Sequence, residues 1–206
     1  MAMLQEERRR EAREAEENLR VIRDLMERST KHSTFSGLSG VLAGAASIVG
    51  CLMTRALEQE RLRPTEFQTS FLLLWSAVIV FAVGADYLLT KRRAAQVGKY
   101  VMSRLGTQMI LGSAPGLGTG ALLTLFFLRQ GLLAFIYPFW MLCYGIAVCA
   151  VGQFSQREVS YLGAAFLWAG AMTLFLPPSC SLWMMAASFG GFHIVYGIRM
   201  ARKDGW

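Results

Sequence analysis

Six apolar stretches, separated by short polar segments, dominate the hydropathy pattern of the chain. They cover roughly residues 34–54, 68–90, 106–128, 131–153, 159–176 and 181–200, each close to the ~20 residues that a helix needs to cross a bilayer. The fifth is the shortest and ends at Pro177 and Pro178, which cannot continue a helix. This pattern predicts an all-α polytopic membrane protein with six transmembrane helices arranged as three hairpins, occupying residues 33–203.

A highly charged segment, residues 1–32, precedes the apolar stretches. It contains no Gly or Pro, and acidic residues precede basic ones by four positions, as at Glu16 and Arg20, which favours a helix. Leu19, Ile22 and Met26 fall on one stripe, so we expect a cytoplasmic amphipathic helix. The stripe either rests on the bilayer or the bundle, or binds a protein partner or a second copy of the chain.

The composition excludes an ordinary soluble domain, because 54% of the 206 residues are hydrophobic and only 17% are charged. The net charge of +7 does not point to nucleic acid, since the charged head is balanced and the surplus lies beside apolar stretches. Basic side chains in such places contact anionic lipid headgroups. The candidates are Lys91, Arg92, Arg93, Lys99 and Arg104.

The distribution of Lys and Arg predicts the orientation. Seventeen of them fall in the head, the second and fourth connections and the C-terminus, and four fall in the remaining connections. Since basic residues of short loops stay on the cytoplasmic side, both termini are predicted to be cytoplasmic, which requires an even number of spans. The expected location is the bacterial inner membrane.

Two ionisable residues lie well inside the predicted spans, Asp86 and His193. Both fall in the predicted cytoplasmic half, near Tyr196, Gln108 and Gln153, where they would form a polar ion or substrate site. The alternatives are structural. Asp86 would then form an interfacial salt bridge with Lys91, Arg92 or Arg93. His193 would be a neutral imidazole that bonds a neighbouring helix.

The third stretch contains Pro115 and Gly116 within a run of four glycines. This run predicts either a kinked or broken helix of the kind that exposes backbone groups in transporters, or a close-packed glycine face with an ordinary proline kink. A weak internal repeat also appears, because the even-numbered stretches each carry an early tryptophan: Trp75, Trp140 and Trp183.

The sequence contains no motif for an enzyme, a metal site or a haem. There is no Cys-x-x-Cys, although Cys51 and Cys180 lie toward the same predicted outer face and are candidates for pairing. His193 is the single histidine within a span, so a bis-histidine haem lacks a second ligand. The cofactor is unknown, and a bound lipid or pigment is left open.

The segments Met26–Gly40 and Phe192–Lys203 resemble those of uncharacterised small bacterial multi-span membrane proteins. The resemblance implies the fold class and the inner membrane, but no activity and no functional residue. Two functions therefore stand as hypotheses. The first is a partner-binding component, sensor or scaffold that acts through its cytoplasmic helix and basic inner loops. The alternative is a small oligomeric transporter or channel with a polar site in the cytoplasmic half.

Overall fold

The computed structural model describes residues 36–96 and 104–204, together with Arg10, 13–14, 16–19 and 21–22 of the charged head. Apart from the short connections, these residues are helical and none lies in a strand, which confirms the all-α prediction. The helices are α2 (Gly37–Gln59), α3 (Pro64–Gln96), α4 (Arg104–Gln130), α5 (Leu133–Gly152), α6 (Arg157–Leu174) and a last segment that is divided into η1 (Pro178–Cys180), α7 (Ser181–Met185), η2 (Ala186–Phe192) and α8 (His193–Asp204).

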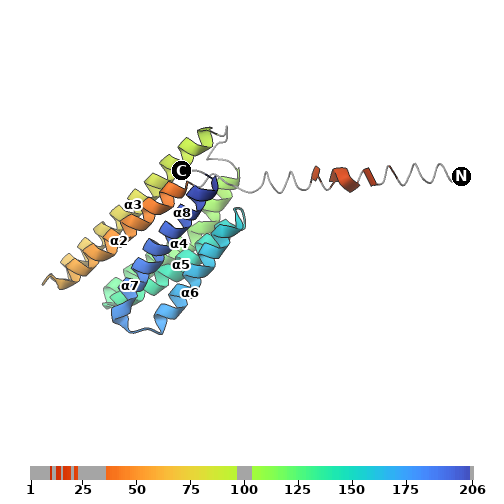
Figure 1. The fold of residues 1–206 in the computed structure, drawn as a ribbon. Helices are drawn as coiled ribbons and strands as arrows, with labels where there is room; N and C mark the ends of the chain where they lie inside the picture. The colour runs from red at the N-terminus through yellow and green to blue at the C-terminus, as the bar shows by residue number, and fades with distance from the viewer. Residues whose placement is uncertain are drawn as a thin grey trace.

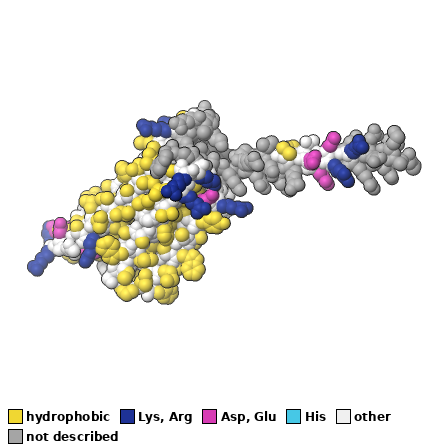
Figure 2. Space-filling view, in the orientation of Figure 1, with side chains coloured by type: hydrophobic (Ala, Val, Ile, Leu, Met, Phe, Trp, Pro, Cys, Tyr) yellow, Lys and Arg dark blue, Asp and Glu magenta, His cyan; other side chains and the backbone are white. Residues whose placement is uncertain are grey.

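Five helices are long and apolar enough to cross a membrane. They occupy Gly37–Gln59, Pro64–Arg92, Gly106–Gln130, Leu133–Gly152 and Pro178–Lys203. Helix α6 is not among these five, since it has 18 residues and its first turn contains Arg157 and Glu158. Figure 2 shows hydrophobic side chains over the flank of the bundle and Lys and Arg gathered toward its ends, the distribution expected of a protein surrounded by lipid.

The bundle has two distinct ends (Figure 1). At the end that we call the basic end, α2, α4 and α6 begin and α3, α5 and α8 finish, as shown by the Ser39–Asp86 and Lys203–Glu158 contacts between helices. The opposite end, called the loop end, contains the turns after α2, α4 and α6 and the contact between Tyr137 and Glu58.

Glycines let the helices approach closely. On the α2–α8 face, a Cβ atom at Gly44 would meet the carbonyl oxygen of Gly190 at 2.6 Å. On the α5–α6 face, Gly145 and Gly163 lie against each other's backbone, so a side chain at either position has no room. Small residues are the usual device for helix association in membranes, where the hydrophobic effect does not drive helices together.

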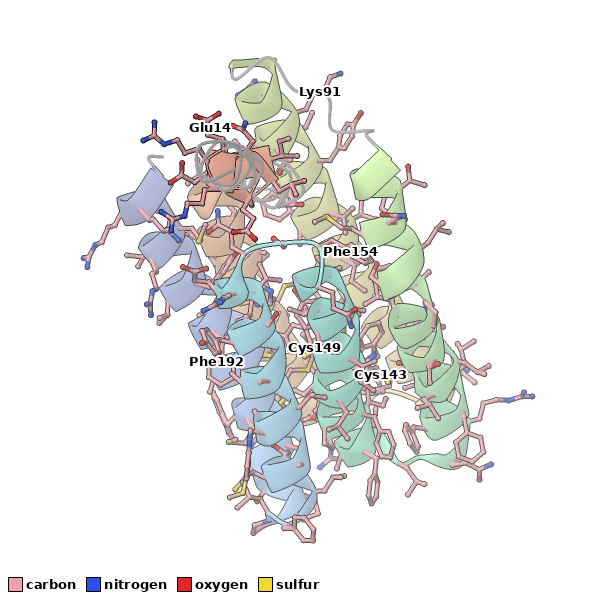
Figure 3. The ribbon with its side chains drawn as sticks, turned by 90° about the vertical axis from the view of Figure 1, so that its right-hand side faces the viewer. Glu14, Lys91, Cys143, Cys149, Phe154 and Phe192 are labelled. Carbon is pink, nitrogen blue, oxygen red and sulfur yellow. The ribbon has the colours of Figure 1, made fainter. Side chains whose placement is uncertain are left out.

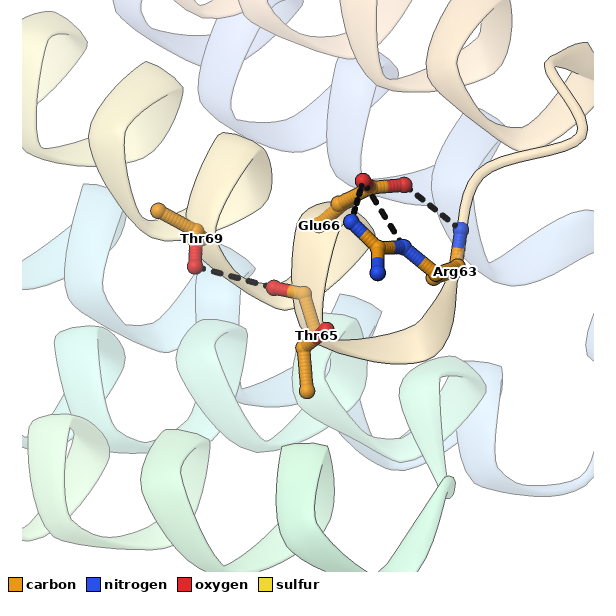
Figure 4. A network of polar contacts seen from close by, with 4 residues as sticks. All are labelled: Arg63, Thr65, Glu66 and Thr69. Carbon is orange, nitrogen blue, oxygen red and sulfur yellow. Dashed lines mark hydrogen bonds and ion pairs between the residues drawn. The ribbon is translucent and has the colours of Figure 1, made fainter.

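Local signals fix where α3 begins. Pro64 occupies the first helical position, where a missing N–H costs nothing. The backbone N–H of Arg63 donates to Glu66, 3.0 Å away, and the guanidinium of Arg63 binds the same carboxylate (Figure 4). The Glu66 carboxylate thus accepts the Arg63 N–H, one of the backbone donors that the start of a helix leaves free.

The last helix is regular except over Ala186–Phe192, where it takes the π form. A π-helical stretch is rare and is found most often at functional sites, since it widens the helix and turns the following residues by an extra step. The residue directly after this stretch is His193.

Candidate functional site

The two ionisable residues of the spans are each held by a side chain from another helix. Asp86 lies on α3, and its Oδ1 accepts a hydrogen bond of 2.7 Å from the hydroxyl of Ser39 on α2. Ser39 is buried, and its hydroxyl also lies 2.8 Å from the carbonyl oxygen of Ser36. Because a hydroxyl carries one hydrogen, Ser39 donates to only one of these two acceptors at a time.

The structure gives Asp86 no cationic partner among the side chains that it describes. The ion pairs there are Arg55–Glu58, Arg63–Glu66 and Lys203–Glu158. Lys91 instead extends over the ring of Tyr87, with its nitrogen 6.0 Å from the ring centre, and Arg92 is exposed. The described side chains therefore show no salt bridge of Asp86 with Lys91 or Arg92. The salt bridge stays a prediction for Arg93, whose side chain lies outside the described residues.

His193 bonds to α5 and to its own helix. Its Nδ1 lies 2.9 Å from the carbonyl oxygen of Phe189, and its Nε2 lies 2.7 Å from the hydroxyl of Tyr144. Since a carbonyl oxygen only accepts, Nδ1 carries the hydrogen, and in the neutral imidazole Nε2 accepts from Tyr144. Phe189 lies within the π-helical stretch, and His193 directly follows it.

An aromatic cluster encloses this pair. Phe166 of α6 and Phe189 both lie about 5 Å, ring centre to ring centre, from Tyr144. Tyr144 also interacts electrostatically with Asp86 and with Tyr196. Helices α3, α5 and α8 therefore bring Asp86, Tyr144, His193 and Tyr196 into one polar region near the basic end.

Two predicted members of this region lie elsewhere. Gln108 and Gln153 are both exposed, at the start of α4 and directly after α5, and neither joins the cluster. Sequence reasoning missed Ser39 and Tyr144, which supply the hydrogen bonds to Asp86 and His193. Neither type of residue stands out inside an apolar stretch, because serine packs as a small residue and tyrosine is common near membrane interfaces.

Thr90 is a further polar residue that the sequence did not single out. It is only 8% exposed, and its hydroxyl has no hydrogen-bond partner within the described part of the chain. It lies four residues after Asp86, hence on the same face of α3.

Helix α4 is continuous through Pro115, so a broken helix at this position is excluded. Gly116 lies against the Cys143 carbonyl oxygen and Ala147 of α5, which favours the close-packed glycine face. The predicted kink at Pro115 and Gly116 stays a prediction. Figure 3 shows α5 with Cys143 on the side of α4 and Cys149 nearer α6, where its sulfur faces Gly163.

The structure describes only some of the predicted lipid-contacting and partner-binding residues. Lys91, Arg92, Leu19 and Ile22 are exposed. Met26 and Lys99, with the side chains of Arg93 and Arg104, lie outside the described residues. All four cysteines, including Cys51 and Cys180, are free thiols. The described residues contain no group of three or more His, Cys, Asp or Glu that would hold a metal.

Known proteins offer no guide here, since no family model, curated protein or solved structure matches the chain.

Proposed function

We propose that the chain is a bacterial inner-membrane protein with six spans and cytoplasmic termini, and that it binds a cytoplasmic protein partner as a sensor or scaffold. The span that is added to the five long apolar helices is α6, the fifth in chain order. Gly163 lies against Gly145, and Gly170 lies against Leu142 and Pro138, so α6 follows α5 along most of its length. A helix packed in this way occupies the same depth in the bilayer as its neighbour.

The observation that carries the partner-binding proposal is the exposure of apolar side chains within the charged head. Leu19 is 66% exposed and Ile22 is 52% exposed, three positions apart on one face of a helix. Inside a segment in which half of the residues are charged, such a stripe is typical of a helix that inserts into the groove of a partner. The basic end offers Arg157, Arg199 and Arg202 as further contacts.

The hydrogen bonds of the bundle support this reading over transport. Toward the loop end, the described hydroxyls of Thr54, Thr124 and Thr173 each donate to a carbonyl oxygen of their own helix. Transport requires polar groups that lead from one side of the membrane to the other, whereas these hydroxyls use their one hydrogen within their own helix.

Site-specific photocrosslinking in intact cells tests the proposal. A photoreactive residue at Leu19 or Ile22 should form a discrete protein adduct, whereas one at Glu17, on the opposite face of the helix, should not. Deletion of residues 1–31 should remove the adduct partner from the purified complex. Adducts with lipid alone at positions 19 and 22 would contradict partner binding.

Asp86 favours the second candidate, a small transporter or channel, because a carboxylate inside a span with no cationic partner among the described side chains is a candidate for an ion pathway. Flux into proteoliposomes distinguishes the two. Partner binding predicts no flux for the wild type, whereas transport predicts flux that Asp86→Asn and His193→Ala abolish.

A further inference from the structure

One side of α3 has no neighbouring helix, and we propose that it packs against the same side of α3 in a second copy of the chain. In the most apolar part of each span, 39% of the residues of α2 and of α5 are buried within the bundle, against none in α3. Figure 1 shows α3 at the edge of the bundle, beside α2. This inference goes beyond the partner-binding function and does not depend on it, because it concerns the membrane region alone.

The packing of α2 on α3 is repeated by the packing of α4 on α5. A Cβ atom at Gly50 of α2 would lie 3.1 Å from Val78 of α3. In the same way, a Cβ atom at Gly120 of α4 would lie 3.4 Å from Cys143 of α5. Each position of α3 therefore corresponds to the position 65 residues later in α5, as Val78 does to Cys143.

On α5, the side opposite α4 is covered by α6. A Cβ atom at Gly163 of α6 would lie 2.8 Å from the backbone nitrogen of Cys149, so the two backbones are in close contact. Glycines of α6 lie against four residues on this side of α5, which are Pro138, Leu142, Gly145 and Cys149. This side of α5 is thus a surface on which a second helix packs closely.

The corresponding side of α3 is not covered. The residues that match those four positions form what we call the open face of α3: Leu73, Ala77, Val80 and Gly84. Leu73 is 67% exposed, and Val80 is 71% exposed. Ala77 is also exposed, and nothing lies within 4 Å of a Cβ atom at Gly84. The repeat therefore indicates a helix-packing surface whose helix is not supplied by the described part of the chain.

The shape of the open face suits a parallel pair of helices. Its two large residues, Leu73 and Val80, are seven positions apart, and so are its two small residues, Ala77 and Gly84. A seven-residue spacing keeps side chains on one seam of a left-handed helix pair, the commonest kind of helix pair in membranes. Val80 of one copy then fills the recess between Ala77 and Gly84 of the other. One such pair suffices for a dimer in a bilayer, where small residues let two backbones approach closely.

A second copy fits the open face because of its orientation in the bilayer. All copies of the chain insert with the same orientation, since the same basic residues stay on one side. Two α3 helices that meet about a twofold axis along the membrane normal are therefore parallel, and each residue lies at the depth of its counterpart. Ser76 is exposed near the middle of α3, at the margin of the open face. In the dimer its hydroxyl bonds that of the second copy, whereas a lipid tail offers no hydrogen bond.

Subunit counting tests the proposal on the full-length protein in liposomes. With one fluorescent tag per chain, stepwise photobleaching should report two chains per particle as the ratio of protein to lipid rises. Gly84→Leu should weaken dimerisation about tenfold, because the new side chain fills the recess. The fold of each chain should be unaffected, since a Cβ atom at this position meets nothing. Gly118→Leu on α4 is the matched control, because nothing lies within 4 Å of a Cβ atom there either, and it should dimerise like the wild type.

Disulfide crosslinking in native membranes locates the contact. In a variant whose four native cysteines are replaced by alanine, Val80→Cys should form a disulfide-linked dimer when the membranes are oxidised with copper phenanthroline. Leu111→Cys is the control, since Leu111 is 65% exposed on α4 and lies outside the open face. It should remain a monomer under the same conditions.

Single chains at every ratio of protein to lipid would show that lipid covers the open face and would overturn the proposal. So would equal dimerisation of Gly84→Leu and Gly118→Leu, or equal crosslinking at positions 80 and 111. A Val80→Cys adduct with a different protein, and none with a second copy, would contradict the assignment of the face to a dimer.

Discussion

The first helix pair, α2 and α3, resembles the second pair, α4 and α5, at the loop end. The two pairs differ at the basic end. In the first pair, the indole nitrogen of Trp75 donates to Thr54, 3.1 Å away, and the ring packs on Gly50. In the second pair, Trp140 donates to Thr124 at 2.7 Å, and its ring packs on Gly120. Thr54 and Thr124 each donate to the carbonyl oxygen of that glycine.

The basic ends of the two pairs diverge. Counted from the threonine and the tryptophan, the positions of Ser39 and Asp86 in the first pair correspond to Met109 and Val151 in the second. One pair therefore places a carboxylate where the other places an apolar residue. We infer that the loop end is a repeated structural brace and that the basic end of the first pair is specialised for function.

The largest effect should come from removing either tryptophan. Trp75→Ala and Trp140→Ala should each destabilise the protein by about 3–5 kcal/mol, because both leave a cavity and remove the hydrogen bond that the indole donates to a threonine hydroxyl. Unfolding in micelles measures the loss. If the two braces are equivalent, the losses should agree within ~1 kcal/mol; a severe loss in one variant and none in the other would break the comparison.

Adding a side chain at Gly44 of α2, where this helix contacts the last helix, should have the next largest effect on stability. Gly44→Val should cost about 1–3 kcal/mol by overpacking, because a Cβ atom there meets Gly190 and Ile194. The control is Gly118→Val, since nothing lies within 4 Å of a Cβ atom at Gly118. Equal melting temperatures of the two variants would show that α2 and α8 are not in close contact.

Replacing Ser39 and Asp86 by apolar residues, like those at the matching positions of the second pair, should have a smaller effect on stability. Ser39→Ala alone should cost about 1–3 kcal/mol, because the Asp86 carboxylate loses its described donor. Adding Asp86→Val should recover that loss, since an apolar pair needs no hydrogen bond. A double variant less stable than Ser39→Ala would show that Asp86 is a structural residue.

The smallest effect concerns Glu158 and Lys203, which join α6 to α8 at the basic end. A hydrogen bond from Lys203 lowers the pKa of the Glu158 carboxyl below its usual range. The folded state is therefore stabilised above the usual pKa of a glutamate, and this stabilisation is lost as pH falls through the lowered value. In Lys203→Ala, carboxyl NMR should report a higher pKa for Glu158, whereas Lys91→Ala should leave it unchanged.

The sequence predicts the helices better than it predicts their contacts. Hydropathy and length indicate the membrane helices, because each apolar stretch must satisfy its backbone within one helix. Asp86 and His193 were found because ionisable residues stand out in an apolar stretch. Their partners were not found, since the register between helices decides which serine or tyrosine faces them.

The π-helical stretch at Ala186–Phe192 was likewise not predicted from the sequence. It has no proline and no charged residue to mark it, and Pro115, which does carry such a mark, lies in a continuous helix. Within this stretch, Gly190 packs closely against Gly44 and Ile48 of α2, a contact that the sequence alone does not reveal.

The most direct test of the account is whether α6 crosses the membrane, because the proposal that both termini are cytoplasmic requires an even number of spans. In a variant with the four native cysteines replaced by alanine, Gln156→Cys lies before α6 and Ser179→Cys lies after it. In intact cells, an impermeant maleimide should label Ser179→Cys and should reach Gln156→Cys only after the inner membrane is opened. Labelling of both positions from the same side would contradict six spans.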